Sequence, residues 1–268
     1  MSEVRAGDAA FVGNIPQMYD DLLVPIFFEA PAQSVAATIA HTRPTTILET
    51  AAGTGALTRA MLAATSARIT ATDLNQPMLD AARARTDSDR VTWDVADALD
   101  LTYPDETFDV VTCQFGVMFF PDRVRGYAEA HRVLKPGGAF VFTVWDTIDT
   151  NAISDTVTRA LRPEAGDVDL EFLARTPYGH AQDNVLESAL RTAGFVDIQI
   201  THVDGTGRTN AHDGAVAVCE GTPLRGEIEQ HPTMTLERAG QLGEAALRER
   251  FGAGEFDAPM RWVEIVAR

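Results

Sequence analysis

A glycine turn in the first part of the chain carries the clearest chemical signal. Residues 49–55 read ETAAGTG and connect a short apolar run to a helical pattern. A tight turn from a strand into a helix presents free backbone amides at the positive end of the helix dipole, which favours an anionic group. Gly53 leaves room for a ligand against the backbone, although glycines also serve simply to reverse a chain. The turn therefore predicts a ligand site without defining the ligand.

Two common nucleotide-binding patterns do not fit this turn. A P-loop requires Gly-Lys-Ser or Gly-Lys-Thr, but Gly55 is followed by Ala56 and Leu57. A dinucleotide fingerprint requires a third small residue three positions after Gly55, where Thr58 stands, and the chain has no Tyr-x-x-x-Lys pair. An NAD-dependent oxidoreductase is therefore the weaker alternative.

The segments around the turn alternate between apolar strands and helical patterns. The predicted strands are residues 45–49, 68–73, 91–95, 108–113, 139–145, 195–203 and 260–267. The predicted helices between them are residues 55–64, 76–85, 122–134 and 184–193. Strands that alternate with helices in this way favour a parallel sheet with helices on both faces.

Four landmarks follow one another along this pattern: ETAAGTG after the first strand, Asp73 ending the second, Asp97-Ala98 after the third, and FDVVTCQFGVMF followed by RVLKPGG. With these landmarks, residues 45–203 resemble the class I methyltransferases, in particular the small-molecule branch that includes ubiquinone and menaquinone biosynthesis enzymes. The resemblance implies a Rossmann-like, doubly wound α/β fold. Its seven-stranded sheet is mostly parallel with an antiparallel last strand, and helical cap segments complete it. The implied cofactor is S-adenosylmethionine, with S-adenosylhomocysteine as its product.

The resemblance also assigns roles to residues around the turn. Glu49 and the turn amides meet the ammonium and carboxylate of the methionine moiety, and Asp73 accepts hydrogen bonds from both ribose hydroxyls. Asp97 takes the adenine amino group, while the Ala98 amide meets a ring nitrogen. The complete set of predicted cofactor-binding residues is Tyr19, Glu49, Thr50, Ala51, Gly53, Asp73, Leu74, Met78, Asp97, Ala98, Gln114 and Phe115.

Some of these assignments have a plain structural alternative. Asp73 also suits a helix N-cap, and Leu74 and Met78, expected against the adenine faces, also suit an ordinary core. The chain departs from the family pattern at Ala51, where many members carry glycine. It also has Cys113-Gln114-Phe115-Gly116 in place of an Asn-Pro-Pro-Tyr or Asp-Pro-Pro-Tyr run, which argues against methylation of an amide or of an adenine amino group.

The acceptor is expected at the carboxyl edge of the sheet, beside Gln114 and Phe115. We expect residues 1–44 to form a helical cap, 45–203 the cofactor-binding core with an insertion at 146–180, 204–258 a substrate-side insertion, and 259–268 the final core strand. Together with residues 114–119, these cap and insertion segments would bound the pocket of a small-molecule acceptor.

Methyl transfer by in-line displacement requires neither a metal nor a covalent intermediate, so no metal ligands are predicted. A general base helps only an acceptor that begins protonated. The candidates are His180, His202 and His212, with Tyr178 as an orienting group. A protein that binds the cofactor without transferring methyl is the remaining alternative.

The composition narrows the partners. With 22 basic and 39 acidic side chains the chain has a net charge of -17, which argues against DNA or RNA because their binders bring Lys and Arg to the phosphates. Cys113 and Cys219 give no metal spacing and no disulfide framework. No apolar run approaches about 20 residues and the N-terminus shows no secretory pattern, so we expect a cytoplasmic protein without a membrane span. A homodimer is left open.

Overall fold

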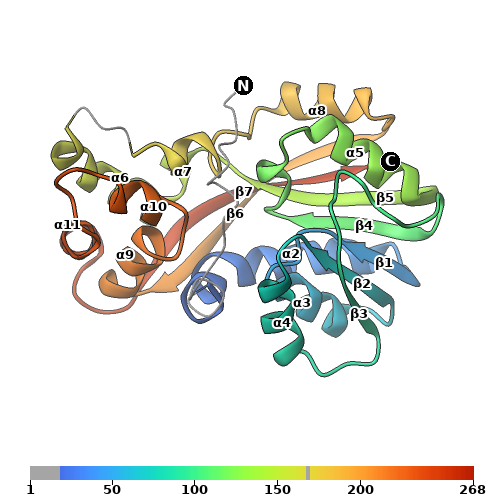
Figure 1. Cartoon of the computed structure of the whole chain (residues 1–268), viewed down its shortest axis with the longest axis horizontal. Coiled ribbons are helices and arrows are strands. Elements are labelled where there is room, and N and C mark those ends of the chain that lie inside the picture. The colour runs from blue at the N-terminus through green and yellow to red at the C-terminus, as the bar shows by residue number, and fades with distance from the viewer. Residues whose placement is uncertain (1–18, 167–169) are drawn as a thin grey trace. The chain divides into compact units, whose positions relative to one another are not determined.

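A computed structural model describes residues 19–166 and 170–268, and its chain divides into two compact units (Figure 1). Residues 31–144, 180–203 and 262–268 form one of them, called the sheet unit below. The described residues of 19–30, 145–179 and 204–261 form the other, called the helical unit. Each unit is described by itself.

One seven-stranded sheet runs through the structure in the order β3-β2-β1-β4-β5-β7-β6. Its strands are β1 (Thr46–Glu49), β2 (Arg68–Asp73), β3 (Val91–Val95), β4 (Phe108–Gln114), β5 (Leu134–Trp145), β6 (Ile198–Thr209) and β7 (Phe256–Ala267). The pairs β1 with β2, β1 with β4, β2 with β3 and β4 with β5 are all parallel. Asp197 and Arg268 exchange two backbone hydrogen bonds of 2.9 and 2.8 Å, the pattern of an antiparallel pair. The predicted doubly wound sheet with an antiparallel last strand is confirmed.

Helices cover both faces of the sheet unit. They are α2 (Glu29–His41), α3 (Ala56–Ala64), α4 (Gln76–Ala84), the short η2 (Val117–Phe119), α5 (Arg123–Val133) and α8 (Asp183–Thr192). Figure 1 shows α5 and α8 on one side and α2, α3 and α4 on the other. Because side chains alternate along β5, Ala139 and Val141 join the core under α2 and α3, whereas Phe140 and Phe142 pack on Tyr127 of α5.

The last two strands are longer than the sequence pattern predicts. β6 continues to Thr209, past the expected end at residue 203, and β7 begins at Phe256. Ion pairs between the two strands support the extension, with Arg261 Nε 2.6 Å from Asp204 Oδ1 and Arg208 Nη2 3.0 Å from Glu255 Oε2. Alternating hydrophobic residues alone did not mark this polar pair of strand ends.

The helical unit contains the remaining helices. They are η1 (Tyr19–Phe28), η3 (Ile148–Thr150), α6 (Ala152–Ala165), α7 (Phe172–Arg175), α9 (Ala211–Cys219), α10 (Leu224–Glu229) and α11 (Leu236–Phe251). Helix α11 packs closely against α6 and α9 because glycines lie at the contacts. A Cβ on Gly243 would stand only 3.2 Å from Ala215 Cβ and Val157 Cγ1.

One helical run meets the length and apolarity of a membrane span. It is Asp20–His41, 22 residues long, and half of its most apolar window is buried. The expectation that no apolar run reaches this length was therefore wrong, since helical continuity through Pro25 joins two segments that the sequence pattern separated. Core helices of soluble proteins and signal sequences meet the same criterion, so this run alone is weak support for a span.

Candidate active site

The carboxyl ends of β1, β2 and β4 lie side by side where the strand order reverses. Glu49 of β1 is in register with Ala71 of β2 and Thr112 of β4, so Asp73 and Gln114 each stand two residues further along. In open α/β sheets, ligands bind at this point of reversal, outside the carboxyl ends of the strands. The structure thus brings three of the predicted site residues to one edge.

Asp73 organises the glycine turn. Its Oδ2 accepts a hydrogen bond of 2.9 Å from the Gly53 amide, and its Oδ1 accepts bonds from the Asn75 amide and side chain at 2.8 and 3.2 Å. Burial raises the pKa of Asp73, and these bonds oppose the shift. The residue at the N-cap position of α4 is Asn75, so the alternative role of Asp73 as that cap is wrong.

Glu49 is a buried acid beside the same turn. Its carboxylate accepts a hydrogen bond from the Thr58 hydroxyl, and its backbone oxygen accepts one of 3.0 Å from Thr72 Oγ1. Burial raises the pKa of Glu49 to about 8, against the opposing effects of Thr58 and the Arg59 guanidinium. A cationic group placed here would favour the ionised carboxylate. The sequence pattern missed the role of Thr58, which it used only to reject a dinucleotide site.

Two residues at this edge adopt a strained backbone. Ala51 has a φ of 52° and Phe115 a φ of 54°, in the left-handed region that glycine prefers. Such strain is concentrated at functional sites, where the surroundings hold it in place. Ala51 fits because Gly116 faces it: a Cβ on Gly116 would lie 2.4 Å from Ala51 Cβ and 2.6 Å from Cys113 Sγ. The departure from glycine at position 51 is thus accommodated by glycine at position 116.

We expect Gly116→Ala to destabilise the fold by about 1–3 kcal/mol, because the added methyl must displace two packed neighbours. Adding Ala51→Gly should recover part of this loss, since one of the two clashes disappears. Chemical denaturation of the single and double variants measures both effects. Gly226→Ala is the matched control, as a Cβ there meets nothing within 4 Å. An unchanged stability of Gly116→Ala would contradict the packing described.

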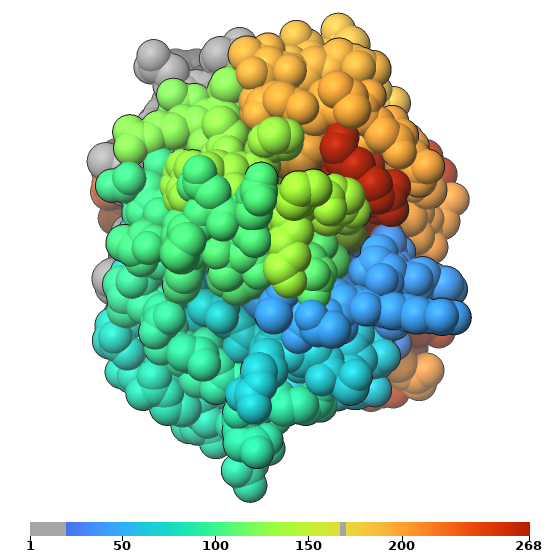
Figure 2. Space-filling view, turned by 90° about the vertical axis from the view of Figure 1, so that its right-hand side faces the viewer, coloured from blue at the N-terminus to red at the C-terminus, as the bar shows by residue number. Residues whose placement is uncertain are grey.

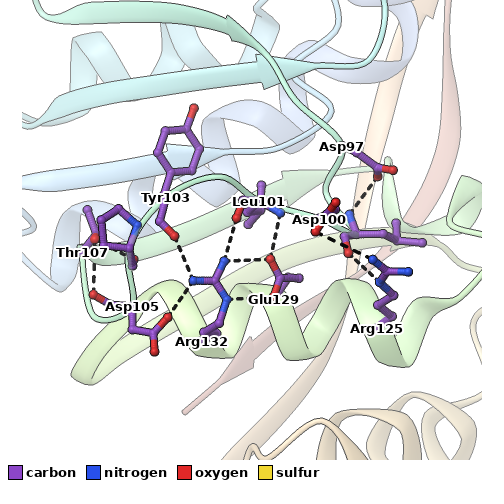
Figure 3. A network of polar contacts seen from close by, with 11 residues as sticks. Asp97, Asp100, Leu101, Tyr103, Asp105, Thr107, Arg125, Glu129 and Arg132 are labelled. Carbon is purple, nitrogen blue, oxygen red and sulfur yellow. Dashed lines mark hydrogen bonds and ion pairs between the residues drawn. The ribbon is translucent and has the colours of Figure 1, made fainter.

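The loop after β3 carries Asp97 and Ala98 and is bonded to α5 (Figure 3). Asp97 is exposed, and its Oδ1 accepts a bond of 2.9 Å from the Leu99 amide. Further along, Arg132 Nη1 donates to the Tyr103 carbonyl at 2.8 Å, and Nη2 donates to the Leu101 carbonyl at the same distance. Glu129 fixes Arg132 through two bonds of 2.8 Å and also accepts the Leu101 amide. Sequence reasoning treated this part of α5 only as a landmark and missed both residues.

The apolar residues predicted to contact the cofactor have different surroundings. Leu74 is 62% exposed directly after Asp73, so it is not a core residue. Met78 and Phe115 are buried, and Gln114 is half-buried. Tyr19 begins η1, but its side chain lies outside the described part of the structure. Contact of these residues with a cofactor stays a prediction.

The candidate bases are divided between the two units and have different surroundings. Tyr178 belongs to the helical unit, where its hydroxyl lies 2.8 Å from Ser154 Oγ and burial raises its pKa. His202 and His212 are exposed and form surface pairs with Asp183 and Glu244 at 3.2 and 3.1 Å.

His180 alone among the histidine candidates is buried. Its Nδ1 lies 2.7 Å from Nη2 of Arg123. Burial and the Arg123 charge lower the pKa of His180 to about 4, so its ring is neutral at pH 7. A general-base role for any of the four residues stays a prediction.

A pocket of about 760 Å³ lies at the amino ends of the strands, the opposite edge of the sheet unit. Figure 2 shows the molecule from this side. Its lining includes Arg43, Lys135 and Arg268. Lys135 Nζ is already bound to Asp109 at 2.8 Å, and Arg268 Nη1 lies 3.6 Å from Asp197. Lys135 and Arg268 thus have protein partners, and the pocket lies at the amino ends of the strands, away from Asp73 and Glu49, so it is not the candidate site.

Comparison with known proteins supports a methyltransferase. The family profile described as "Methyltransferase domain" matches residues 48–142. The demethylmenaquinone methyltransferase of Clavibacter sepedonicus is 34% identical over 165 residues, which cover 57% of this chain and 66% of that one. The ubiquinone/menaquinone biosynthesis C-methyltransferase UbiE of Geobacter sp. (strain M21) is 31% identical over 178 residues, covering 60% of this chain and 74% of that one.

A solved structure agrees at the level of the fold. Phosphoethanolamine N-methyltransferase 2 of Haemonchus contortus, in complex with S-adenosyl-L-methionine, has a TM-score of 0.60 at 18% identity, covering 97% of this chain and 58% of that one. The glycine turn with Asp73, the ordered landmarks and the relatives lead to one conclusion. The chain belongs to the class I S-adenosylmethionine-dependent methyltransferases and resembles the ubiquinone and menaquinone biosynthesis enzymes among them.

Proposed function

We propose that this methyltransferase acts on a hydrophobic or mixed-polarity metabolite, and that a ring of the quinol type is the first acceptor class to test. The names of the relatives motivate the ring, because they act in ubiquinone and menaquinone biosynthesis. The observation that carries the proposal is the Asp73 carboxylate bonded to the Gly53 amide beside buried Glu49. Two acids beside a glycine turn at one sheet edge suit a zwitterionic nucleoside ligand.

The residues present fit the cofactor. The buried carboxyl of Glu49 suits an ammonium group, Asp73 suits a ribose diol, and exposed Leu74 suits an apolar ring face. Asp97 and the Ala98 amide would meet the adenine edge. When bound, S-adenosylmethionine supplies a methyl group on a sulfonium.

The residues of the chain would bind the cofactor and the acceptor, orient them toward each other and exclude water. In well-aligned reactions these effects lower the barrier by up to roughly 7–11 kcal/mol. We further propose that residues 204–258 serve the acceptor. A cytoplasmic location and the oligomeric state stay predictions.

The affinity for S-adenosylhomocysteine is expected to rise with pH. In the protein without ligand the pKa of Glu49 is about 8, so its carboxyl is mostly protonated at pH 6.5. Binding of the ligand ammonium must therefore release that proton. The affinity should rise by up to about tenfold per pH unit below the Glu49 pKa of about 8, and level off above it, where the carboxyl is already ionised.

Calorimetry in buffers of different ionisation enthalpy measures the proton release directly. Glu49→Gln should bind more weakly and without proton release, while Glu237→Gln, at an exposed position of α11, should match the native chain. Binding with no proton exchange at pH 6.5 would contradict the assignment of Glu49 to the ammonium.

The function is tested by parallel calorimetry and thermal unfolding with S-adenosylmethionine, S-adenosylhomocysteine and NAD. A ligand at about 100 times its dissociation constant stabilises a protein by about 2.7 kcal/mol, a shift of several degrees. We expect both adenosyl ligands to bind and NAD to have no effect. A labelled-methyl assay on reduced naphthoquinones then tests transfer. Binding without transfer to any small acceptor would favour the non-catalytic alternative.

A further inference from the structure

Arg123, the first residue of α5, is a partly buried cation that has no acidic partner among the described residues. The described arginines that are partly buried are Arg59, Arg90, Arg123, Arg132, Arg175, Arg225 and Arg261. Six of them donate to carboxylates or backbone carbonyls. Within the described part of the chain, the Arg123 guanidinium instead forms hydrogen bonds only with the imidazole of His180. In a chain with 39 acidic side chains, this exception requires a physical reason.

His180 orients Arg123 but does not neutralise it. The ring is 4% exposed, and its Nδ1 lies 2.7 Å from Arg123 Nη2. A neutral imidazole accepts a hydrogen bond from the guanidinium and brings no negative charge. Withdrawing a cation from water is costly unless an anion lies against it. Within the described part of the structure, the pair therefore carries a positive charge that no acid compensates, and only Nη2 of the guanidinium donates a hydrogen bond.

Tyr127 adds an unused polar group on the same face of the helix. It stands four residues after Arg123, a spacing that places two side chains next to each other on a helix. Its hydroxyl is fully buried and has no hydrogen-bond partner in the described part of the structure. Burial raises the pKa of Tyr127, so the group remains a neutral hydroxyl that can donate. Buried polar groups are normally paired, so the hydroxyl points to a missing partner.

These groups lie at the edge of the sheet that carries the cofactor residues. Helix α5 starts a few residues after the carboxyl end of β4, through η2. His180 precedes α8, which packs against α5 and leads into the amino end of β6 (Figure 1). Both helices therefore begin at the carboxyl edge, where an acceptor of a methyltransferase of this fold is expected.

We propose that Arg123, held by His180, binds a carboxylate on the methyl acceptor. The inference rests on the proposed function and narrows its substrate class to acceptors that carry an acid group. One uncompensated cation and one hydroxyl donor match the single charge and two oxygens of a carboxylate better than the double charge of a phosphate. A guanidinium fork also suits a planar carboxylate, which is ionised at pH 7, whereas a phenol is not.

The test compares 2-naphthoate, 2-naphthamide and 2-naphthol by calorimetry on the full chain saturated with S-adenosylhomocysteine. Naphthoate is expected to bind at least about tenfold more tightly than the amide or the alcohol, since a charged hydrogen bond is worth about 1.5–3 kcal/mol. Arg123→Gln should remove this preference and Arg123→Lys should keep part of it. Tyr127→Phe should reduce it a few-fold. Arg68→Gln, an exposed arginine at the start of β2, removes the same charge and should change nothing.

The outcomes separate the two proposals. If the native chain fails to bind S-adenosylhomocysteine, the proposed function fails before the acceptor is tested. If the cofactor product binds but naphthoate shows no preference over the amide, or does not bind, the carboxylate inference is overturned and the methyltransferase assignment stands. An unchanged preference in both Arg123 variants also overturns it, provided that both bind S-adenosylhomocysteine as the native chain does.

Discussion

Asp73→Ala is expected to lower the affinity for S-adenosylhomocysteine by about 100-fold or more. The substitution removes the proposed acceptor of the ribose hydroxyls and also frees the Gly53 amide, which Asp73 holds at 2.9 Å. Two hydrogen bonds to a charged group, at about 1.5–3 kcal/mol each, correspond to this loss. Asp73→Asn keeps the size of the side chain and one acceptor oxygen, so its affinity should lie between those of the native chain and of Asp73→Ala. Titration calorimetry measures all three proteins.

Asp80→Ala is the matched control for this experiment. Asp80 lies on the exposed face of α4, where it accepts a hydrogen bond of 2.7 Å from Gln76. The Asp80→Ala substitution removes the same charge close to the site, but Asp80 contacts neither the turn nor the strand end. The affinity of this variant for S-adenosylhomocysteine should therefore equal that of the native chain. An Asp73→Ala protein that binds within about threefold of the native one would refute the ribose assignment.

Arg132→Met is expected to weaken cofactor binding although Arg132 touches no predicted cofactor contact. The guanidinium makes five hydrogen bonds (Figure 3). Three of them join α5 to the loop after β3, and the other two go to Glu129 of the same helix. Because the side chain is 31% exposed, we expect the free energy of unfolding to fall by about 2–3 kcal/mol, below the loss for a fully buried pair. The affinity for S-adenosylhomocysteine should fall about tenfold, since Asp97 and Ala98 lose their fixed position.

Hydrogen exchange over residues 96–107 distinguishes this explanation from a general loss of stability. Faster exchange confined to the loop, together with weaker binding, is the expected pattern. Arg125→Met provides the comparison, because Arg125 makes one bond to the Leu99 carbonyl and an exposed contact of 3.8 Å with Asp100. Arg125→Met should lower the free energy of unfolding by no more than about 1 kcal/mol. If Arg132→Met binds S-adenosylhomocysteine with native affinity and its loop exchanges at the native rate, Arg132 does not position the loop.

Local sequence signals determined the fold class and the cofactor family. The strands and helices alternate at the periods that the structure shows, and the ETAAGTG turn, Asp73 and Asp97 stand at the ends of successive strands. These features depend on residues close to one another in the chain, where hydrophobic period and turn chemistry are reliable guides. The polar ends of β6 and β7 were missed because charged pairs across strands leave no such period.

Only the tertiary structure decided the chemistry of individual side chains. The raised pKa of Glu49 comes from its burial beside Thr58 of α3. The loop after β3 is held because Arg132 binds carbonyls about thirty residues earlier in the chain. Arg123 and His180 are 57 residues apart in the sequence and are brought together by packing. Burial, charge compensation and unpaired hydroxyls are properties of groups brought together by packing. A linear pattern names the residue types of a site, but the distances and solvent exclusion that set their reactivity arise when distant segments pack.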